Sequence, residues 1–420
     1  MMSRLRPLRE LEPRDRRPAA WAATQFACVM TANFVLRAVR EEMGVQGGVD
    51  NLPWLFTATF VGTLLLVPAY GWAAGRWGRR QLSRGLYLGL ALSLLLPLLA
   101  WVLALVPVMM LRRAVFVWLS VINMIAVAGF WAAVVDVWRG ERAPRVYALV
   151  AAGGTVGALV GPALALGLVD AIGPHGLLLV GAIAWVLAAS CGEALERALR
   201  ERDDVPDAAR PMGGSSWAGL RDVIANPALR GLAIWILAYT ATSTALYLMQ
   251  ARIVGGAIAS PEARTALFAR VDLGVNILAL ALQLTLTGRV LARARLATVL
   301  SVLPGITVLL ALALATVPLL GVLVLAQLLR RACEHGFAKP ARELLYAATP
   351  RETKFKGQNA LDTLVYRGGD VISAWAVQAL ASVTGITGVG LATAGIGAGW
   401  WWFSRRLAAR RSPGEAHDRS

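Results

Sequence analysis

The feature that most constrains this chain is a series of long apolar runs that recurs from one end to the other. Each is about 18 residues long or more and is bounded by Arg, Pro or Gly. The runs cover residues 19–36, 53–74, 85–106, 114–135, 146–168, 176–191, 232–249, 267–287, 297–317, 319–337, 359–381 and 383–403. A helix of about 20 apolar residues crosses the hydrocarbon core of a bilayer. The sequence therefore predicts an all-α polytopic membrane protein with twelve transmembrane helices.

Composition supports this fold class. Hydrophobic residues make up 57% of the 420 residues and charged residues 16%, whereas soluble globular proteins have roughly 45–50% and 25%. Twelve spans and their connections use nearly the whole chain, so little remains for a domain in water.

The strong positive charge has a topological explanation. The chain has 42 Lys and Arg against 25 Asp and Glu, a net charge of +17, and positive residues accumulate in cytoplasmic loops. If the N-terminus is cytoplasmic, the external connections hold few basic residues: Arg37, Arg40, Arg112, Arg113, Arg252 and Arg264. We therefore expect both termini in the cytoplasm of a bacterial cell with the chain in its inner membrane, and no nucleic-acid partner is needed to explain the charge.

The longest connection divides the spans into two sets of six. Residues 192–230 contain ERALRERDD, two prolines and GGSS, which is typical of a cytoplasmic linker. The predicted organisation is a tail at 1–18, a six-helix half at 19–191, the linker at 192–230, a second half at 231–404 and a tail at 405–420. Two halves of equal helix number are common in secondary carriers.

Polar side chains form stripes on several predicted helices, although a charge at hydrocarbon depth is costly unless it faces protein or water. The stripes, found by turning 100° per residue, are Asp272, Asn276, Gln283 and Thr287; Tyr239, Ser243 and Gln250; Gln327, Arg331 and Glu334; and Asp362, Tyr366, Asp370 and Ser373. By contrast, the interiors of the third, sixth, ninth and twelfth runs are uncharged, as expected of lipid-facing helices.

The stripes have two interpretations. Opposite charges at helical spacing could simply brace the bundle, as for Arg37 before Glu41, Arg330 before Glu334, and Arg367 before Asp370. Because four spans each have a polar face, we favour a central polar cavity lined more heavily by the second half.

Two motifs resemble those of the major facilitator superfamily. After the second run, GWAAGRWGRR (71–80) resembles the loop G-x-x-x-D-R-x-G-R-R, with Gly75 in place of the acidic residue. In the fifth run, GTVGALVGP (154–162) is similar to the family's glycine-proline motif, whose small residues let two backbones pack closely. The resemblance implies a six-plus-six bundle whose first, fourth, seventh and tenth helices line the cavity. Loss of the acid at Gly75 puts the loop's locking network in doubt.

Three further patches resemble the ATP/ADP translocase family of plastids and intracellular bacteria. They are KFKGQNALDTLVYRGGD (354–370), VLRAVREEMGV (35–45) and ALFARVDLGVN (266–276). This resemblance implies a nucleotide as substrate. A nucleotide has three or four negative charges, which Arg and Lys would bind in a desolvated pocket.

The candidate site residues follow from the stripes and the resemblance. Expected substrate-binding residues are Arg37, Arg40, Tyr239, Asn276, Arg330, Arg331, Lys356 and Arg367. Expected coupling or gating residues are Asp136, Asp272, Glu334, Asp362 and Asp370. The acidic residues roughly balance the basic ones, so a smaller or zwitterionic solute remains an alternative. Asp272 or Glu334 could instead transfer a coupling proton.

Motifs for catalysis and metal binding are missing from the sequence. It contains no G-x-x-x-x-G-K-[ST] loop, no H-E-x-x-H and no G-x-S-x-G, so we expect no enzyme activity, no cofactor and no metal. Cys28, Cys191 and Cys333 are far apart in apolar surroundings, which favours small buried side chains over a disulfide or a metal site.

These observations predict a secondary active transporter that works by alternating access. Its expected substrate is a small anionic metabolite, with ATP/ADP exchange as the specific hypothesis. The alternatives are a proton-coupled exporter of amphiphilic compounds and a non-transport membrane scaffold. We expect the bilayer and a small-molecule substrate as its partners, and take a monomer as the starting hypothesis.

Overall fold

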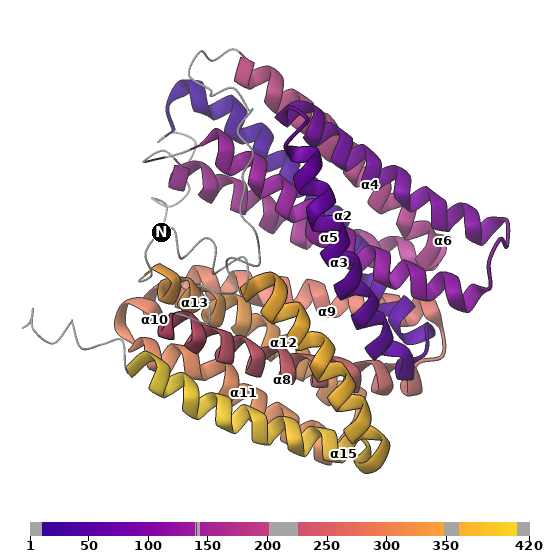
Figure 1. Ribbon diagram of the computed structural model, residues 1–420, viewed down its shortest axis with the longest axis vertical. Helices are drawn as coiled ribbons and strands as arrows, with labels where there is room; N and C mark the ends of the chain where they lie inside the picture. The colour runs from indigo at the N-terminus through magenta and orange to yellow at the C-terminus, as the bar shows by residue number, and fades with distance from the viewer. Residues whose placement is uncertain (1–10, 139, 141–142, 201–225, 348–360, 410–420) are drawn as a thin grey trace, which may run out of the picture. The chain divides into compact units, whose positions relative to one another are not determined.

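The structure is a computed structural model that describes residues 11–138, 140, 143–200, 226–347 and 361–409. All regular elements among these residues are helices, as the apolar runs predict (Figure 1). Nine helices in this part of the chain are long and apolar enough to cross a membrane. The chain is an all-α polytopic membrane protein.

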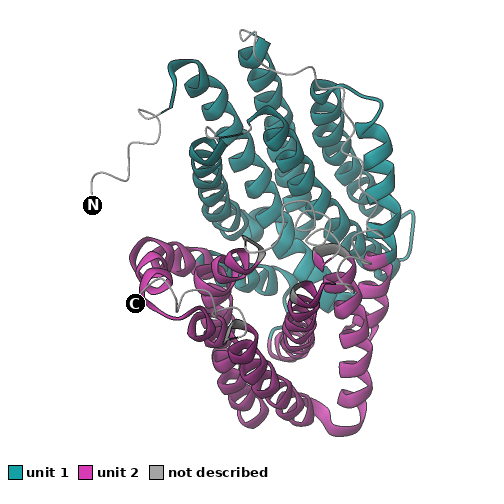
Figure 2. Cartoon of the chain, turned by 60° about the vertical axis from the view of Figure 1, so that its left-hand side comes forward, with its two compact units in different colours: residues 1–47, 61–213, 258–273 teal, residues 48–60, 214–257, 274–420 magenta. Residues whose placement is uncertain are grey.

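The chain divides into two compact units (Figure 2). Unit 1 consists of residues 1–47, 61–213 and 258–273, and unit 2 of residues 48–60, 214–257 and 274–420. Two short segments are separated in sequence from the rest of their unit: residues 48–60 belong to unit 2 and residues 258–273 to unit 1.

Unit 1 is built from the first five long helices and the beginning of a later one. These are α2 (Pro13–Gln46), α3 (Leu52–Ala74, from residue 61), α4 (Arg79–Val102), α5 (Val108–Val137), α6 (Ala143–Arg200) and the start of α9 (Pro261–Leu282). Helix α6 contains two predicted spans. Gly173, with φ 68°, and the following Pro174 interrupt its helical geometry, because glycine adopts positive φ freely and proline cannot continue a helix.

Helices α2 and α6 of unit 1 pack with their backbones close together. Gly153, Gly157 and Gly161 are spaced four apart on α6, and a Cβ atom added to them would meet the carbonyl oxygens of Ala23, Ala27 and Thr31 on α2, respectively. At Gly161 that distance is 2.7 Å. The predicted close packing of the 154–162 motif is thus present, and its partner is the first helix.

Unit 2, like unit 1, contains a long helix that includes two predicted spans and bends at a glycine. Its helices are α8 (Pro227–Ala257), the remainder of α9, α10 (Gly288–Arg293), α11 (Leu296–Thr316), α12 (Leu320–Cys333), α13 (Lys339–Ala347) and α15 (Tyr366–Ala409), with the short η2 (Val49–Asn51). Helix α15 also contains two predicted spans and bends at Gly385, with φ 66°. In both halves a positive-φ glycine therefore joins the last two spans.

Three π-helical turns interrupt the helices of unit 2 in the residues that the structure describes. They are η4 (Gln283–Thr287), η5 (Glu334–Ala338) and η6 (Leu361–Val365). A π-turn misaligns backbone hydrogen bonds, and such turns are often found at functional sites. Side chains of η4 bind the carbonyls of η5: Gln283 Nε2 donates to His335 O at 3.1 Å and Thr287 Oγ1 donates to Gly336 O at 2.8 Å.

The observed helices extend further than the predicted runs. Helix α2 spans Pro13–Gln46 rather than 19–36, and α6 continues to Arg200, within the segment 192–230 that we predicted as a linker. Hydropathy marks the apolar part of a helix only, whereas backbone hydrogen bonds continue into the polar ends. Residues 201–225 and 348–360, with most of the linker and the start of the eleventh run, lie outside the described residues.

Candidate functional site

The most unusual side chain of unit 2 is Arg330, near the end of α12. Its side chain is buried, with 6% of its surface exposed. Among the described residues its side chain makes one hydrogen bond, from Nη1 to Ser243 Oγ on α8 at 2.9 Å, and its Nε is buried without an acceptor. The guanidinium lies 5.9 Å from the ring centroid of Tyr239. A buried cation is normally compensated by a carboxylate, so this arginine is incompletely satisfied.

Glu334 follows Arg330 by one helical turn. Its carboxylate lies near the Tyr239 hydroxyl, and the Tyr239 ring lies against Tyr366 on α15, with ring centroids 5.9 Å apart. The sequence spacing predicts an Arg330 to Glu334 pair, and no such ion pair within 4.0 Å is found among the described residues. Arg330 donates instead to Ser243 on α8, and Glu334 begins the π-turn η5.

A second polar cluster lies one turn further along α15. Asp370 is 7% exposed and accepts a hydrogen bond from Thr244 Oγ1 on α8 at 3.1 Å. Arg367 Nη1 lies 3.9 Å from Asp370 Oδ2, as its three-residue spacing predicts. A Cβ on Gly369 would lie 2.5 Å from Thr240 Oγ1, so α15 and α8 are in close contact here.

A rigid aromatic core holds Tyr239 in position. The Trp235 and Tyr239 rings are stacked with centroids 6.0 Å apart, and Trp400 packs edge-on against both. Trp235 Nε1 donates to Ser404 Oγ at 3.0 Å. These rings are at most 6% exposed, so Tyr239 belongs to the core and presents its hydroxyl to the polar groups.

The predicted residues of the first helix lie in unit 1. Arg37 Nε is 3.4 Å from Asp272 Oδ2 and 3.9 Å from Glu41 Oε1. Arg40 forms an ion pair with Glu41, and its guanidinium lies 6.0 Å from the Phe116 ring. Asp272 is 2% exposed. Arg37 thus contacts both Asp272 and Glu41, and Glu41 also pairs with Arg40.

Unit 1 also contains a buried ion pair that the sequence did not reveal. Arg264 donates from Nε and Nη2 to the two carboxylate oxygens of Glu42, at 2.7 and 2.8 Å, and from Nη1 to the carbonyls of Ile258 and Ala259. Glu42 is fully buried and Arg264 is 7% exposed. The two residues are far apart in the sequence, and Arg264 was counted only as an external charge.

The basic residues that follow α3 pair with acidic residues of α6. Arg79 donates to Glu196 at 2.6 and 3.0 Å, and Arg84 pairs with Glu193 at 3.1 Å. Both carboxylates are on the last turns of α6. The network put in doubt by Gly75 therefore exists within unit 1, supplied by another helix.

The remaining predicted residues are more dispersed. Asn276 and Arg331 are half-buried in unit 2, and Asp136 is half-buried near the end of α5 in unit 1. The backbone of Asp362 lies in η6, but its side chain is outside the described part, as is all of Lys356.

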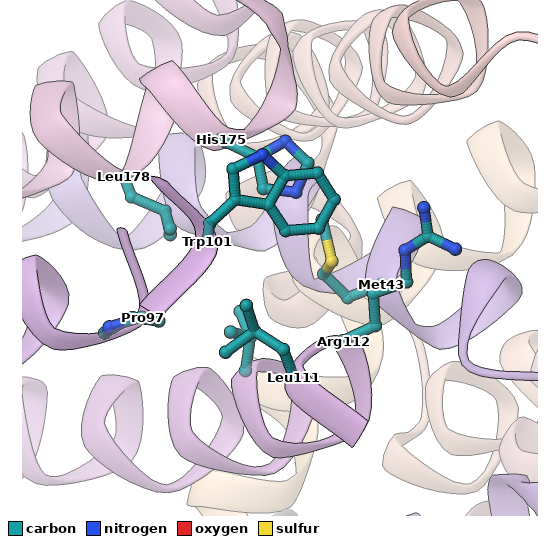
Figure 3. Close-up of a pocket in the computed structure, with 8 residues that line it drawn as sticks. Met43, Pro97, Trp101, Leu111, Arg112, His175 and Leu178 are labelled. Carbon is teal, nitrogen blue, oxygen red and sulfur yellow. The ribbon is translucent and has the colours of Figure 1, made fainter. Parts of the chain in front are cut away.

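The described histidine of unit 1 is in a small apolar pocket. Figure 3 shows the Trp101 ring against His175, with ring centroids 3.6 Å apart, and Met43, Leu111 and Arg112 nearby. No group of three His, Cys, Asp or Glu side chains that could hold a metal occurs within the described residues. The packing of this pocket provides no metal site.

This arrangement of apolar helices with buried charges defines an integral membrane protein of the transporter class. Residues 22–329 match the family model of the Major Facilitator Superfamily. The chain belongs to this superfamily, whose members are not enzymes. No curated protein matches the sequence.

Solved structures share this fold at low sequence identity. The nucleoside transporter NupG, as a point mutant, has a TM-score of 0.65 at 12% identity, covering 92% of this chain and 99% of that one. A bacterial homologue of the iron transporter ferroportin, in its inward-facing state, has a TM-score of 0.64 at 13% identity, covering 92% and 98%. A POT family transporter in complex with 5-aminolevulinic acid has a TM-score of 0.64 at 10% identity, covering 93% and 96%.

Proposed function

We propose that this protein is a secondary carrier for a small anionic metabolite, and that Arg330 binds the anion. The observation that supports this is the buried Arg330 guanidinium with an Nε that lacks an acceptor. A substrate carboxylate or phosphate would supply the missing charge and the missing hydrogen bond.

The neighbouring groups favour one negative charge over several. Arg367 lies near Asp370, and Glu334 interacts electrostatically with Lys339, His335 and Arg330. The two carboxylates thus offset part of the positive charge of this cluster, which supports a singly charged or zwitterionic solute. The resemblance to the ATP/ADP translocases supports the nucleotide version of the proposal, in which Arg331 and Lys356 would also contact phosphate.

Within this proposal Glu334 is the coupling residue. Lys339, His335 and Arg330 all lie within electrostatic reach of Glu334, so an anion bound at Arg330 would change the charge balance around this carboxylate. Asp272, paired with Arg37, serves as a gate, and the protein operates in a bacterial inner membrane with both termini cytoplasmic.

The test is transport by purified protein in proteoliposomes with Arg330→Gln. Labelled small carboxylates, amino acids and phosphate esters are supplied with a proton gradient, and labelled ATP or ADP is supplied against a nucleotide-loaded lumen. We expect Arg330→Gln to reduce flux by about 10- to 100-fold, because a hydrogen bond to a charged group contributes about 1.5–3 kcal/mol. Its melting temperature should change little, because removing an incompletely paired buried charge costs little stability.

Arg289→Gln is the matched control, since Arg289 is exposed on α10 of the same unit. Normal flux in Arg330→Gln would contradict the anion site. Efflux of amphiphilic cations that does not depend on Arg330 would favour the exporter, and the absence of flux for every solute class would favour the scaffold. Nucleotide counterflow decides between the nucleotide and small-anion versions.

A further inference from the structure

Two of the three cysteines, remote in the sequence, are neighbours in unit 1. Cys28 lies on α2 and Cys191 on the second arm of α6, and their thiols lie close enough to interact. Both are free and partly exposed. Cys333 belongs to unit 2. Helix packing therefore brings together two cysteines that no sequence spacing connects.

The backbones on either side of the pair are held close together. Gly192, next to Cys191, has no Cβ, and one built there would lie 2.6 Å from Gln25 Nε2, three residues before Cys28. Gln25 is 3% exposed and donates to Ser83 Oγ on α4 at 3.2 Å. These contacts fix the register of α6 on α2 where the thiols meet. A disulfide requires Cβ atoms roughly 3.5–4.5 Å apart, so a pair already in thiol contact needs little rearrangement.

We propose that Cys28 and Cys191 form an oxidisable dithiol, a site of reversible disulfide formation. With a low-molecular-weight disulfide as oxidant, one cysteine attacks it as the thiolate and forms a mixed disulfide, releasing one small thiol. The second cysteine then attacks the protein sulfur of that mixed disulfide, forming the Cys28–Cys191 bond and releasing the second small thiol. The two cysteine protons leave with the two small thiols, so two cysteines are oxidised and one disulfide is reduced.

The bond would restrain α2 against α6 covalently. If the chain is a carrier as proposed above, the bond would oppose any change in the packing of α2 on α6 during transport, and we expect oxidation to slow transport. This regulatory effect rests on the proposed function, whereas the formation of the bond does not.

The bond is tested on the purified full chain with Cys333→Ser, which leaves only the pair. The protein is treated in liposomes with 4,4′-dithiodipyridine, unfolded, alkylated with a maleimide, and its intact mass measured. We expect a chain two hydrogens lighter than the untreated one, with no pyridyl adduct and no alkylation, restored by dithiothreitol. Cys28→Ser and Cys191→Ser in this background should each keep one pyridyl adduct, because their remaining thiol has no partner.

Two pyridyl adducts on one chain, or two free thiols after treatment, would overturn the dithiol. Transport is measured on the same samples before and after oxidation. Unchanged flux in the disulfide form would overturn the regulatory role. If the reduced protein transports nothing, the proposed function fails, while the mass still decides whether the dithiol exists.

Discussion

The two units of this protein hold their buried polar groups in different ways. In unit 1 two arginines are each bound by both oxygens of one carboxylate, Arg264 by Glu42 and Arg79 by Glu196, and glycines of α6 let it approach α2 closely. In unit 2 the described helices contain three π-turns, and the buried Arg330 has an unsatisfied Nε.

This difference between the units suggests which of them is structural and which contacts the substrate. Satisfied ion pairs and close backbone contacts resist rearrangement, because breaking them leaves buried charges or cavities. A π-turn and an incompletely paired cation are costly in a folded protein and persist where a ligand or a movement compensates for them. This difference supports the proposal that Arg330 of unit 2 contacts the substrate, with unit 1 as the structural frame.

The largest effect is expected when the buried ion pair of unit 1 is broken by Arg264→Ala. The substitution leaves Glu42 fully buried without its partner, so we expect a loss of about 3–5 kcal/mol, the typical cost of breaking a buried pair. Thermal unfolding in detergent, followed by tryptophan fluorescence, measures the effect. Arg270→Ala is the control, because Arg270 is exposed on the same helix. Equal melting temperatures for the two variants would show that the ion pair contributes nothing to unit 1.

A smaller effect is expected from Gly157→Ala, which lies at the contact between α6 and α2. The added Cβ would meet Ala27 O and lie 2.9 Å from Met30 Cβ, so we expect destabilisation of about 1–3 kcal/mol from overpacking. At Gly167, on the same arm of α6, nothing lies within 4 Å of an added Cβ. Gly167→Ala should therefore stabilise the helix by up to about 1 kcal/mol. Melting curves that shift in the same direction for both would refute the close contact.

The smallest effect concerns the π-turns of unit 2. Thr287→Val removes the hydrogen bond to Gly336 O and should cost about 0.5–1.5 kcal/mol. Thr285→Val is the control, since its hydroxyl binds a carbonyl of its own helix in an exposed position. If η5 is supported by η4, Thr287→Val should also increase amide hydrogen exchange around Gly336. Unchanged exchange there would mean that the two turns are independent.

The helices of this fold were largely predictable. A helix that spans a bilayer satisfies its own backbone hydrogen bonds and exposes apolar side chains to lipid. It therefore appears in the sequence as a run of apolar residues. The runs at 53–74 and 297–317 agree with α3 and α11 within a residue at each end. The glycines of the 154–162 motif also indicated close packing, though not that α2 is the partner.

The candidate site was predictable in its composition only. The stripes selected Tyr239, Glu334, Tyr366 and Asp370, and the four-residue spacing to Glu334 added Arg330; these residues lie on α8, α12 with η5, and α15. Their pairing differed, because Arg330 donates to Ser243 on another helix. Spacing along one helix predicts neighbours on that helix only and contains no signal for a partner on another helix.

By itself the sequence determined that this chain is an all-α membrane protein, where its apolar segments lie and which helix faces are polar, because each of these depends on local transfer free energies. Only the tertiary structure decided which polar groups meet. The Glu42 to Arg264 pair, the Arg79 to Glu196 pair and the contact of Cys28 with Cys191 all join distant positions. Such contacts depend on how whole helices pack, and a single sequence contains no local record of that packing.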